Sequence, residues 1–407
     1  MKRCTIVLDL GTSSIKCGCV DPAGRLVEAT GAGFHTHSDG ARCETDFEEC
    51  GSVARSVLRD TVKAALEAGR RVEAVLVTGQ AQTFAPVDAD FRPLGPGIVW
   101  LDARAEDEAA ALAEMLPDFD RTAGFREPLP ALYVAKLLWL KSHRPDVFGN
   151  AAHFPLISDY VAHQLTGRFY SDSCTFGMGG VYDITAKTLN GRALRALGLG
   201  PDVFPEIADP VELGYTLTPA AQRELHIDDP VPVYLCGNDQ SASAVGSGLT
   251  NVGDVSVNFG TAMAAYTLAD ALPDELGPQE IAGISPAGAR YFLLSYEPDM
   301  GRALDALKAR HFPESPYDEL FESRSSVPEV AAFVQHCLDR FRGHLSRVGR
   351  LGTPERVYVS GGMTRSEAWL DLLRRHCDHE ILCSNRQEAG LIGAARICAM
   401  KRGGDDA

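Results

Sequence analysis

One short pattern occurs in each half of the chain, and it constrains the fold more than any other feature. Residues 5–21 are predicted to form a strand, a turn at Gly11-Thr12-Ser13 and a second strand. Residues 254–268 repeat this order, with the turn at Gly260-Thr261-Ala262. A Gly-Thr turn between two strands can present backbone N–H groups and a hydroxyl to phosphate. The placement of the two turns predicts two related halves that face one cleft.

The stretch Val233–Leu249 lies between the two turns and holds the strongest candidate for a catalytic group. It begins as an apolar strand and ends at Gly237-Asn238, followed by Asp239, Gln240 and a run of small residues. Asp or Asn before such a run is a helix-start signal, so Asp239 could simply cap a helix. Alternatively, a carboxylate at a strand end beside a helix N-terminus could act on a phosphate-bearing ligand. The spacing alone leaves both interpretations open.

Hydrophobic periodicity and turn residues predict further elements along the chain. The predicted strands are Arg25–Thr30 and Val72–Thr78, and a turn is predicted at Asp88–Pro93, flanked by Thr83–Val87 and Gly97–Trp100. The predicted helices are Val53–Ala68, Arg104–Met115, Tyr133–His143, Leu156–Thr166, Val327–Val348 and Glu388–Met400. Tyr170–Tyr182 is rich in Ser, Thr and Gly and is predicted to be a loop. In Arg356–Trp369 a strand, a turn at Gly361-Gly362 and a helix are predicted, and the two glycines could let a flat ligand approach the backbone.

Length, charge and cysteine content narrow the class of protein. A chain of 407 residues is too long for one ordinary domain, so two are expected. Its 39 basic and 55 acidic residues give a formal net charge of −16, which argues against binding to nucleic acid or to an anionic membrane. The 11 cysteines are scattered without C-x-x-C spacing, which is typical of reduced thiols in a cytoplasmic protein. No apolar stretch approaches the ~20 residues of a membrane span.

Taken in order, these segments resemble the FGGY-type carbohydrate kinases of the actin/Hsp70/sugar-kinase superfamily, a family that includes xylulokinase, gluconokinase and glycerol kinase. The resemblance covers most of the chain. The segments that carry it are Asp9–Lys16, Thr78–Gln82, Trp100–Arg104, Pro130–Trp139, Ser158–Tyr160, Leu165–Gly167, Gly237–Gln240, Asn258–Thr261 and Ser360–Trp369. Asp9–Lys16 and Asn258–Thr261 look like the family's two phosphate motifs, and Thr78–Gln82 and Trp100–Arg104 like its sugar-site segments. Gly237–Gln240 looks like its catalytic segment and Ser360–Trp369 like its adenosine motif.

The resemblance implies an α/β fold of two RNase-H-like domains around an ATP cleft. The N-terminal domain, residues 1–245, would carry the sugar site, the first phosphate motif and the catalytic Asp. The C-terminal domain, residues 246–407, would carry the second phosphate motif and the adenosine motif. The chain resembles a shortened member, because nothing between Leu320 and Ser326 matches the family's F-L-P-Y-x-x-G-E-R-like segment.

The resemblance also implies ATP-dependent phosphorylation of a hydroxyl of a sugar, ketose or polyol, with a xylulokinase-like activity favoured and with ATP and Mg²⁺ as cofactors. Asp239 would be the general base, and Asp9 and Asp239 the metal-side carboxylates. The implied ATP-binding residues are Gly11, Thr12, Ser13, Lys16, Gly260, Thr261, Gly361 and Gly362. The implied substrate-binding residues are Gln80, Ala81, Gln82, Asp102 and Gln240. Lys16 could instead be a solvent-facing strand lysine, and Thr261 an ordinary hairpin residue.

Two departures from the family pattern lie in the binding motifs, and the one in the sugar segment leaves the substrate open. At the positions of Ala81 and Gln82, xylulokinases typically have Met-His and glycerol kinases Arg-Glu. The second phosphate turn has Ala262 where a Ser is frequent. The Gln82 amide can still bridge two hydroxyls, since an amide both donates and accepts hydrogen bonds.

Two other classes of function remain open beside the kinase. One is a non-catalytic ATP or sugar sensor on the same fold. The other is an actin- or Hsp70-like ATPase, which would need the phosphate turns but neither of the sugar segments. The expected partner is a small sugar or polyol, and the resemblance leaves open whether the chain forms a homodimer.

Overall fold

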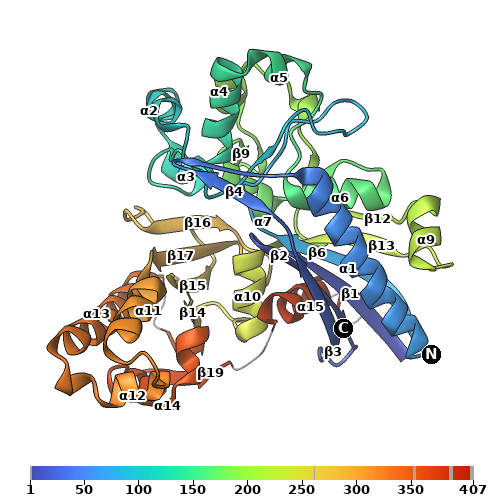
Figure 1. Ribbon diagram of the computed structural model, residues 1–407. Coiled ribbons are helices and arrows are strands. Elements are labelled where there is room, and N and C mark those ends of the chain that lie inside the picture. Colours follow the sequence, from blue (N-terminus) through green and yellow to red (C-terminus); the bar gives the residue numbers. More distant parts are fainter. Residues whose placement is uncertain (1, 261, 352–353, 385–387, 404–407) are drawn as a thin grey trace. The chain divides into compact units, whose positions relative to one another are not determined.

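The computed structural model describes residues 2–260, 262–351, 354–384 and 388–403, and the chain divides into two compact units (Figure 1). Unit 1 contains residues 1–243 together with 390–407, and unit 2 contains residues 244–389. The C-terminal residues therefore return to the first unit. The domain division at residue 245, which was inferred from family resemblance, stays a prediction.

A six-stranded mixed sheet forms the centre of unit 1. Across the sheet the strands are β12 (Gly214–Thr216), β13 (Pro232–Asn238), β6 (Arg70–Gly79), β1 (Lys2–Leu10), β2 (Ser14–Val20) and β3 (Leu26–Gly33). The strands β1, β2 and β3 pair antiparallel in sequence order, while β6 pairs parallel to β1 and β13 pairs parallel to β6. Parallel strands end at the same edge of a sheet, so the ends of β1, β6 and β13 lie together.

Helices cover both faces of this sheet, which explains the nearly continuous apolar run of β1. Helix α1 (Phe47–Glu67) packs against β1, β2, β3 and β6 (Figure 1). It starts six residues before the predicted Val53, because the Asp46 side chain accepts hydrogen bonds from the N–H groups of Glu48 and Glu49 and caps the helix. Helix α15 (Ala389–Arg402) lies on the sheet as well, where Leu391 packs over Gly18 of β2.

Unit 2 repeats the strand order of unit 1. Across its sheet the strands are β16 (Glu280–Ile284), β17 (Tyr291–Glu297), β15 (Met263–Ala269), β14 (Val255–Phe259), β18 (Arg356–Ser360) and β19 (Glu380–Cys383). The strands β14, β15 and β17 pair antiparallel in sequence order, and β18 and β19 extend the sheet in parallel. This order matches β1, β2, β3, β6 and β13. The prediction of an α/β protein with two RNase-H-like domains is therefore confirmed at the level of fold.

The core of unit 2 is mainly aliphatic with a small aromatic cluster, and it includes residues of the sheet and of the helices α13 (Pro328–Gly349) and α14 (Glu367–Arg375). Trp369 is completely buried and packs edge-on against Phe259 at a ring-centroid distance of 5.4 Å. The same tryptophan contacts Phe321 at 5.1 Å. Phe321 belongs to α12 (Tyr317–Glu322), whose end overlaps the start of the Leu320–Ser326 stretch in which nothing matches the family-type segment.

The remaining elements are short or connect the sheets. In unit 1 they are β4 (Thr36–Asp39), β5 (Arg42–Thr45), β7 (Gly97–Ile98), α2 (Glu106–Met115), α3 (Phe119–Ala123), α4 (Tyr133–His143), α5 (Pro145–Asn150), α6 (Ile157–Thr166), β8 (Tyr170–Asp172), α7 (Ser173–Phe176), β9 (Tyr182–Asp183), β10 (Thr188–Leu189), α8 (Gly191–Leu197), β11 (Glu206–Ala208) and α9 (Pro219–Leu225). Helix α10 (Asp239–Ser247) begins in unit 1, and α11 (Met300–His311) belongs to unit 2. Short 3₁₀ turns occur at Gly177–Gly179, Pro201–Val203, Arg324–Ser326 and Gly362–Arg365.

The prediction of a loop at Tyr170–Tyr182 is wrong. The segment contains β8, α7, a 3₁₀ turn and the start of β9, and every residue in it is buried. Its short polar side chains suggested solvent exposure, but in the structure they form hydrogen bonds with one another and with nearby backbone. Asp172 accepts from both the N–H and the hydroxyl of Thr175, which caps α7.

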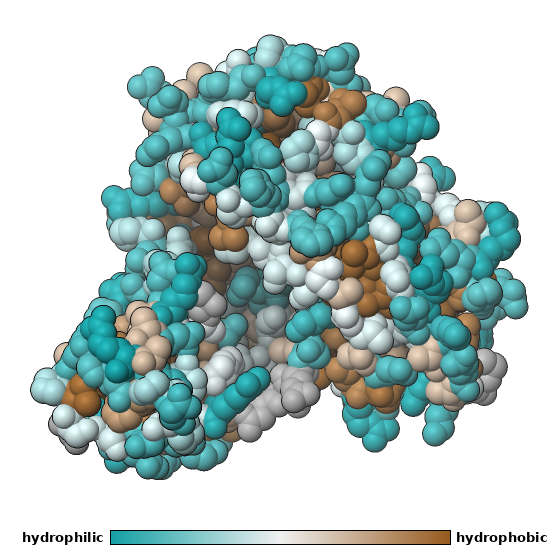
Figure 2. All heavy atoms as spheres, in the orientation of Figure 1, coloured by the Kyte–Doolittle hydropathy of each residue, from teal (hydrophilic) through white to brown (hydrophobic). Residues whose placement is uncertain are grey.

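None of the helices in the described part of the chain combines the length and apolar character needed to cross a membrane. On the side shown in Figure 2 the surface is mostly hydrophilic, with apolar side chains in scattered patches. Scattered apolar side chains are normal on a protein surface.

Candidate active site

The junction of β13 and α10 answers the question of whether Asp239 is needed as a helix cap. Asn238 is buried, and its Oδ1 accepts a hydrogen bond from the N–H of Ser241 at 2.9 Å. This is the geometry of an N-cap side chain. Asp239 is the first residue of the helix, and its Oδ1 accepts from the N–H of Gln240 at 2.7 Å. The cap is therefore supplied by Asn238, and the Asp239 carboxylate is available for another role.

The environment of Asp239 favours a proton acceptor. Burial raises the pKa of the Asp239 carboxyl to about 6, although its hydrogen bond from Gln240 works in the opposite direction. Part of the residue surface stays exposed. A carboxylate with a pKa close to neutral pH is better suited to take a proton from a hydroxyl than one with the ordinary value.

Asp9 lies at the same corner of unit 1. It stands on β1 directly opposite Lys16 of β2, and both residues are half-buried. Gly390, at the start of α15, approaches so closely that an added Cβ would lie 2.7 Å from Asp9 Oδ2 and 3.7 Å from Ser243 Oγ. Ser243 is one turn beyond Asp239 in α10, so the fold brings Asp9, the start of α15 and the Asp239 helix together.

This corner fits a hard cation that retains most of its water. The described residues contain no group of three or more His, Cys, Asp or Glu side chains that could hold a metal ion by themselves. Mg²⁺ usually binds through one or two carboxylates, its own waters and substrate phosphates. The Asp9 carboxylate, close to a serine hydroxyl, is compatible with that coordination.

The sugar segment leads from the end of β6 into an irregular stretch. Gln80 is buried, and its amide is engaged at both ends: Nε2 donates to Gly11 O at 3.1 Å, and Oε1 accepts from Thr83 Oγ1 at 2.8 Å. Gln82 has a left-handed backbone, with φ at +64°, and its side-chain Oε1 is buried with no hydrogen-bond partner among the described residues. Ala81 is half-buried between them. Of the two amides, Gln82 has the unused acceptor.

A buried lysine holds the backbone of the sugar segment at Gln82 in place. Lys136 of α4 is completely buried, and its Nζ donates to Gln82 O at 2.9 Å and to Val99 O at 3.0 Å. Burial lowers the pKa of Lys136 to about 7, while the neighbouring Asp102 acts in the opposite direction. The lysine thereby ties the left-handed residue of the sugar segment to the segment that leads to Trp100.

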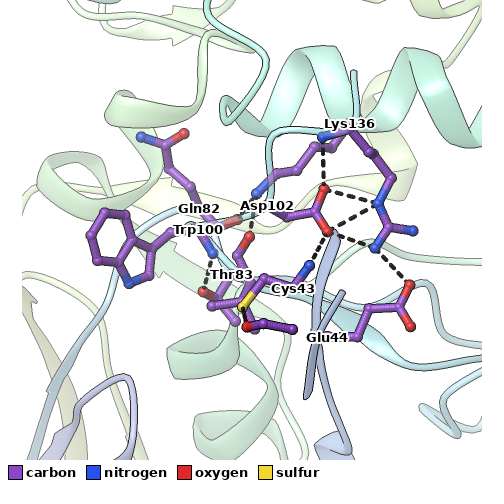
Figure 3. Close-up of polar contacts among 10 residues, drawn as sticks. Cys43, Glu44, Gln82, Thr83, Trp100, Asp102 and Lys136 are labelled. Carbon is purple, nitrogen blue, oxygen red and sulfur yellow. Dashed lines mark hydrogen bonds and ion pairs between the residues drawn. The ribbon is translucent and has the colours of Figure 1, made fainter. Parts of the chain in front are cut away.

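Asp102 is also completely buried, and its carboxylate is surrounded by donors. Oδ2 accepts from the N–H of Cys43 at 2.6 Å, and both oxygens accept from the Arg104 guanidinium. Arg104 in turn contacts Glu44 at 2.6 Å. Figure 3 shows the Gln82 amide and the Trp100 indole projecting away from this buried cluster. The predicted contact of Asp102 with substrate stays a prediction, while the contacts seen here indicate that it shapes the loop.

The remaining predicted residues of unit 1 lie nearer the surface. Gly11 and Thr12 are half-buried, while Ser13 and Gln240 are exposed. The N–H of Gly11 donates to Ser14 O at 3.1 Å and closes the turn between β1 and β2. Trp100 is 43% exposed, and its indole Nε1 donates to Thr12 Oγ1 at 2.9 Å.

In unit 2, the predicted phosphate turn and adenosine motif border one pocket of about 560 Å³. The residues lining it include Phe259, Gly260, Tyr317, Asp318, Gly362 and Arg365. Thr261 lies outside the described residues. The N–H of Gly260 donates to Ala262 O at 3.1 Å, two residues further on, whereas the N–H of Gly11 in unit 1 donates to the residue three positions further on.

Gly361 has a position that only glycine can take at the edge of this pocket. Its φ is +99°, and an added Cβ would lie 2.4 Å from Phe259 O. The turn after β18 therefore passes directly against the end of β14. At Gly362 an added Cβ would meet nothing within 4 Å, so that backbone faces open space.

Several residues of the site were missed in the sequence. Asn238 contacts Met178 Sδ at 3.2 Å and Cys174 Sγ at 3.4 Å, and both sulfurs belong to the segment predicted to be a loop. Thr83, Trp100 and Lys136 were seen only as parts of predicted elements or motifs. A single lysine within the apolar run Tyr133–Leu140 was a signal that a buried cation needed partners.

A protein-family comparison defines the class. Residues 4–246 match the model of the FGGY family of carbohydrate kinases, N-terminal domain, and this chain belongs to that family.

Among curated proteins, the chain is similar to the xylulose kinase of Staphylococcus xylosus, at 25% identity over 274 residues, covering 65% of this chain and 54% of that protein. It is also similar to the gluconokinase of Bacillus subtilis, at 23% identity over 440 residues, covering 95% of this chain and 85% of that protein. The match to the xylulose kinase thus spans about half of that kinase's length.

Solved structures agree with the fold of the whole chain. The xylulose kinase from Rhodospirillum rubrum aligns with a TM-score of 0.90 and 24% identity, covering 100% of this chain and 91% of that one. The glycerol kinase of Plasmodium falciparum with ADP aligns with a TM-score of 0.87 and 16% identity, covering 98% and 90%. At these identities the likeness establishes the fold alone.

Proposed function

We propose that the protein transfers the γ-phosphoryl group of ATP to a hydroxyl of a sugar, ketose or polyol. The observation that carries this proposal is Asp239. Its carboxylate is not needed as the helix cap, has a raised pKa, and stands at the corner of unit 1 where Asp9 is also found. Phosphoryl transfer needs positioning, charge neutralisation and a base for the acceptor hydroxyl, and this corner supplies candidates for each.

In this mechanism Asp239 accepts the proton of the substrate hydroxyl as its oxygen attacks the γ-phosphorus. The Gln82 amide orients the substrate through its unused Oε1, and the exposed Trp100 ring covers an apolar face of the sugar. Aromatic rings provide flat apolar surface without competing for the sugar's hydroxyl groups.

The phosphate chain of ATP is assigned to the turn Gly11–Ser13 and to Lys16 in unit 1. Backbone N–H groups and a hydroxyl at such a turn suit phosphate oxygens, and the lysine adds positive charge. Mg²⁺ held by Asp9, in part through water, would neutralise charge on the phosphates when bound. A second metal-side role for Asp239 remains a prediction.

The adenosine part of ATP is assigned to the pocket of unit 2 beside Gly361 and Gly362. Its volume is in the range of small-molecule sites. The backbone at Gly362 is open to contact by a ligand, as a flat base or ribose would require. Gly260 and Thr261 are proposed to contact phosphate from this unit.

Among substrates, the names of the relatives favour a ketose such as xylulose over gluconate. In unit 1 two cations in or beside the sugar segments are already paired, Lys136 with two backbone carbonyls and Arg104 with Asp102 and Glu44. A sugar acid would need a cation to balance its carboxylate. A neutral polyhydroxylated substrate fits this environment better.

A substrate panel tests the proposal. ADP release is measured with Mg-ATP alone and with xylulose, ribulose, gluconate, glycerol and several pentitols, and the phosphorylated products are identified by mass spectrometry. The kinase proposal predicts slow ADP release alone and strong stimulation by one neutral sugar or polyol. Binding without turnover would indicate a sensor, and fast turnover that ignores every sugar would indicate an ATPase of the actin or Hsp70 type.

A further inference from the structure

A closed circuit of hydrogen bonds joins the two sugar segments to the phosphate turn. Gln80 Nε2 donates to Gly11 O at 3.1 Å, and Thr83 Oγ1 donates to Gln80 Oε1 at 2.8 Å. The backbone N–H of Trp100 donates to Thr83 Oγ1 at 2.9 Å, and its indole Nε1 donates to Thr12 Oγ1 at 2.9 Å. Because Gly11 and Thr12 are neighbours in the chain, the path returns to its start.

The direction of every bond in this circuit is fixed by groups that can act in only one way. The Gly11 carbonyl can only accept, so the Gln80 amide must present its NH₂ group to it and its oxygen to Thr83. The N–H of Trp100 can only donate, so the Thr83 hydroxyl accepts it and passes its own hydrogen to Gln80. Gln80 and Thr83 are buried, which makes an alternative arrangement with unpaired groups costly.

The same reasoning sets the orientation of the Thr12 hydroxyl. An indole N–H has no acceptor function, so Thr12 Oγ1 must accept its hydrogen bond. The hydroxyl hydrogen of Thr12 is then left to point elsewhere, and no residue in the described part of the chain takes it up. An anionic phosphate oxygen needs donors, and a hydroxyl that already accepts one hydrogen bond becomes a stronger donor.

We propose that Trp100 is a positioning residue that turns the Thr12 hydroxyl into a dedicated hydrogen-bond donor for an ATP phosphate oxygen. This inference rests on the proposed function, because it takes the Gly11–Ser13 turn to be a phosphate site. Trp100 then has two separate roles: its ring lies against the sugar, and its indole N–H acts on the nucleotide through Thr12. The sugar segment thereby sets the donor geometry of the phosphate turn.

The first test separates the N–H from the ring. Trp100→Phe keeps an aromatic ring of smaller area and removes the donor, at an exposed residue where a substitution disturbs the core little. Thr12→Val removes the hydroxyl and keeps the shape. Each variant is expected to reduce kcat/KM for Mg-ATP about tenfold, the scale of one hydrogen bond to a charged group. The sugar Kd, measured by calorimetry, should change less than about twofold for both, since no hydrogen bond to the sugar is removed.

The double variant, Trp100→Phe with Thr12→Val, tests whether the two residues act through one hydrogen bond. If Trp100 acts through Thr12, Trp100→Phe has no further effect once the hydroxyl is gone, so the double variant should match Thr12→Val alone. Thr12→Ser, which keeps the hydroxyl, should restore most of the lost kcat/KM and should again be sensitive to Trp100→Phe. Trp139→Phe is the matched control, because this half-buried tryptophan lies outside the circuit, where it stacks on His143 and contacts the Arg104 guanidinium, and makes no contact with Thr12.

Each outcome bears on one proposal. Losses that add in the double variant would overturn the inference while leaving the kinase proposal intact, as would a loss of sugar affinity equal to the loss for Mg-ATP. If the wild type phosphorylates no sugar, the proposed function fails instead. The Kd of a non-hydrolysable Mg-ATP analogue, measured on the same proteins, then supplies the same comparison: coupled losses support the inference, and additive or absent losses contradict it.

Discussion

At the scale of a single residue, the proposed catalytic role of Asp239 and its contribution to stability oppose each other. Burial raises its pKa to about 6, so the ionised form needed for proton transfer is also the form that the folded protein stabilises less well. A residue kept in an unfavourable environment is common where a protein gives up stability for function. The Asn238 cap makes this arrangement workable, because α10 can start without help from the carboxylate.

Replacement of Asp239 by Asn should separate these two effects. The amide cannot accept the substrate proton, so we expect turnover to fall by roughly 10²–10⁴, the usual scale for a general base. The affinities for sugar and Mg-ATP should stay close to wild type by calorimetry. A well-folded Asn variant with near-normal turnover would remove Asp239 from the proposed role.

The raised pKa also predicts the pH dependence of turnover. Below pH ~6 the carboxyl is protonated and cannot act as a base, so kcat/KM for the sugar should fall about tenfold per pH unit there and level off above it. Initial rates between pH 5 and 8, in buffers of constant ionic strength, measure the profile. A flat profile through pH 6 would contradict the assignment.

Stability should change with pH in the opposite direction. The folded state holds the Asp239 proton more tightly than the unfolded chain does, so this group lowers the free energy of unfolding as pH rises from about 4 to about 6. Asp239→Asn lacks this contribution. Its melting temperature relative to wild type should therefore increase across that interval and stay constant above it, as thermal scans of both proteins can show.

At the scale of elements, the start of α15 lies so close to β1 that it fixes Asp9. Gly390→Ala places a Cβ 2.7 Å from Asp9 Oδ2, so the helix or the carboxylate must shift. Misplacement of a reacting group by about 1 Å can cost about 10²-fold in rate, and we expect a loss of that order in Mg-ATP-dependent turnover.

A second glycine supplies the control for this substitution. Gly343 lies inside α13, and an added Cβ there meets nothing within 4 Å. Gly343→Ala should keep full activity and raise stability by about 0.5–1 kcal/mol, the usual gain from Ala in a helix. Equal activity in the two variants would show that the contact at Gly390 does not matter for Asp9.

The elements differ in how well the sequence predicts them, for physical reasons. The helix at Tyr133–His143 was predicted with its observed bounds, because a helix buried on several sides carries a long apolar pattern. Tyr170–Tyr182 was missed, because short polar side chains that pair with one another look the same in sequence as those that face water. The hydrogen bond between Trp100 and Thr12 joins residues 88 positions apart, and no local sequence pattern predicts it.

At the scale of the whole molecule, each unit has its own core and its own proposed ligand-binding residues. Hydrogen exchange can therefore assign ligands to units. Sugar alone should increase protection around Thr78–Arg104 and the start of α10 in unit 1, and leave the pocket segment at Ser360–Ser366 in unit 2 unchanged. An Mg-ATP analogue should protect Ser360–Ser366, because bound backbone opens less often. Protection of that segment by sugar alone would contradict the division of roles.

The return of α15 to unit 1 has a consequence for how the protein is made. A ribosome releases the chain from the N-terminus, and domains generally fold as they emerge. Here the sheet surface that Leu391 covers at Gly18 stays bare until α15 has been synthesised, after the residues of unit 2. Unit 2 can therefore be complete while unit 1 still lacks α15. The nascent protein thus passes through a stage in which Asp9 is already in its strand but lacks the helix that fixes its position.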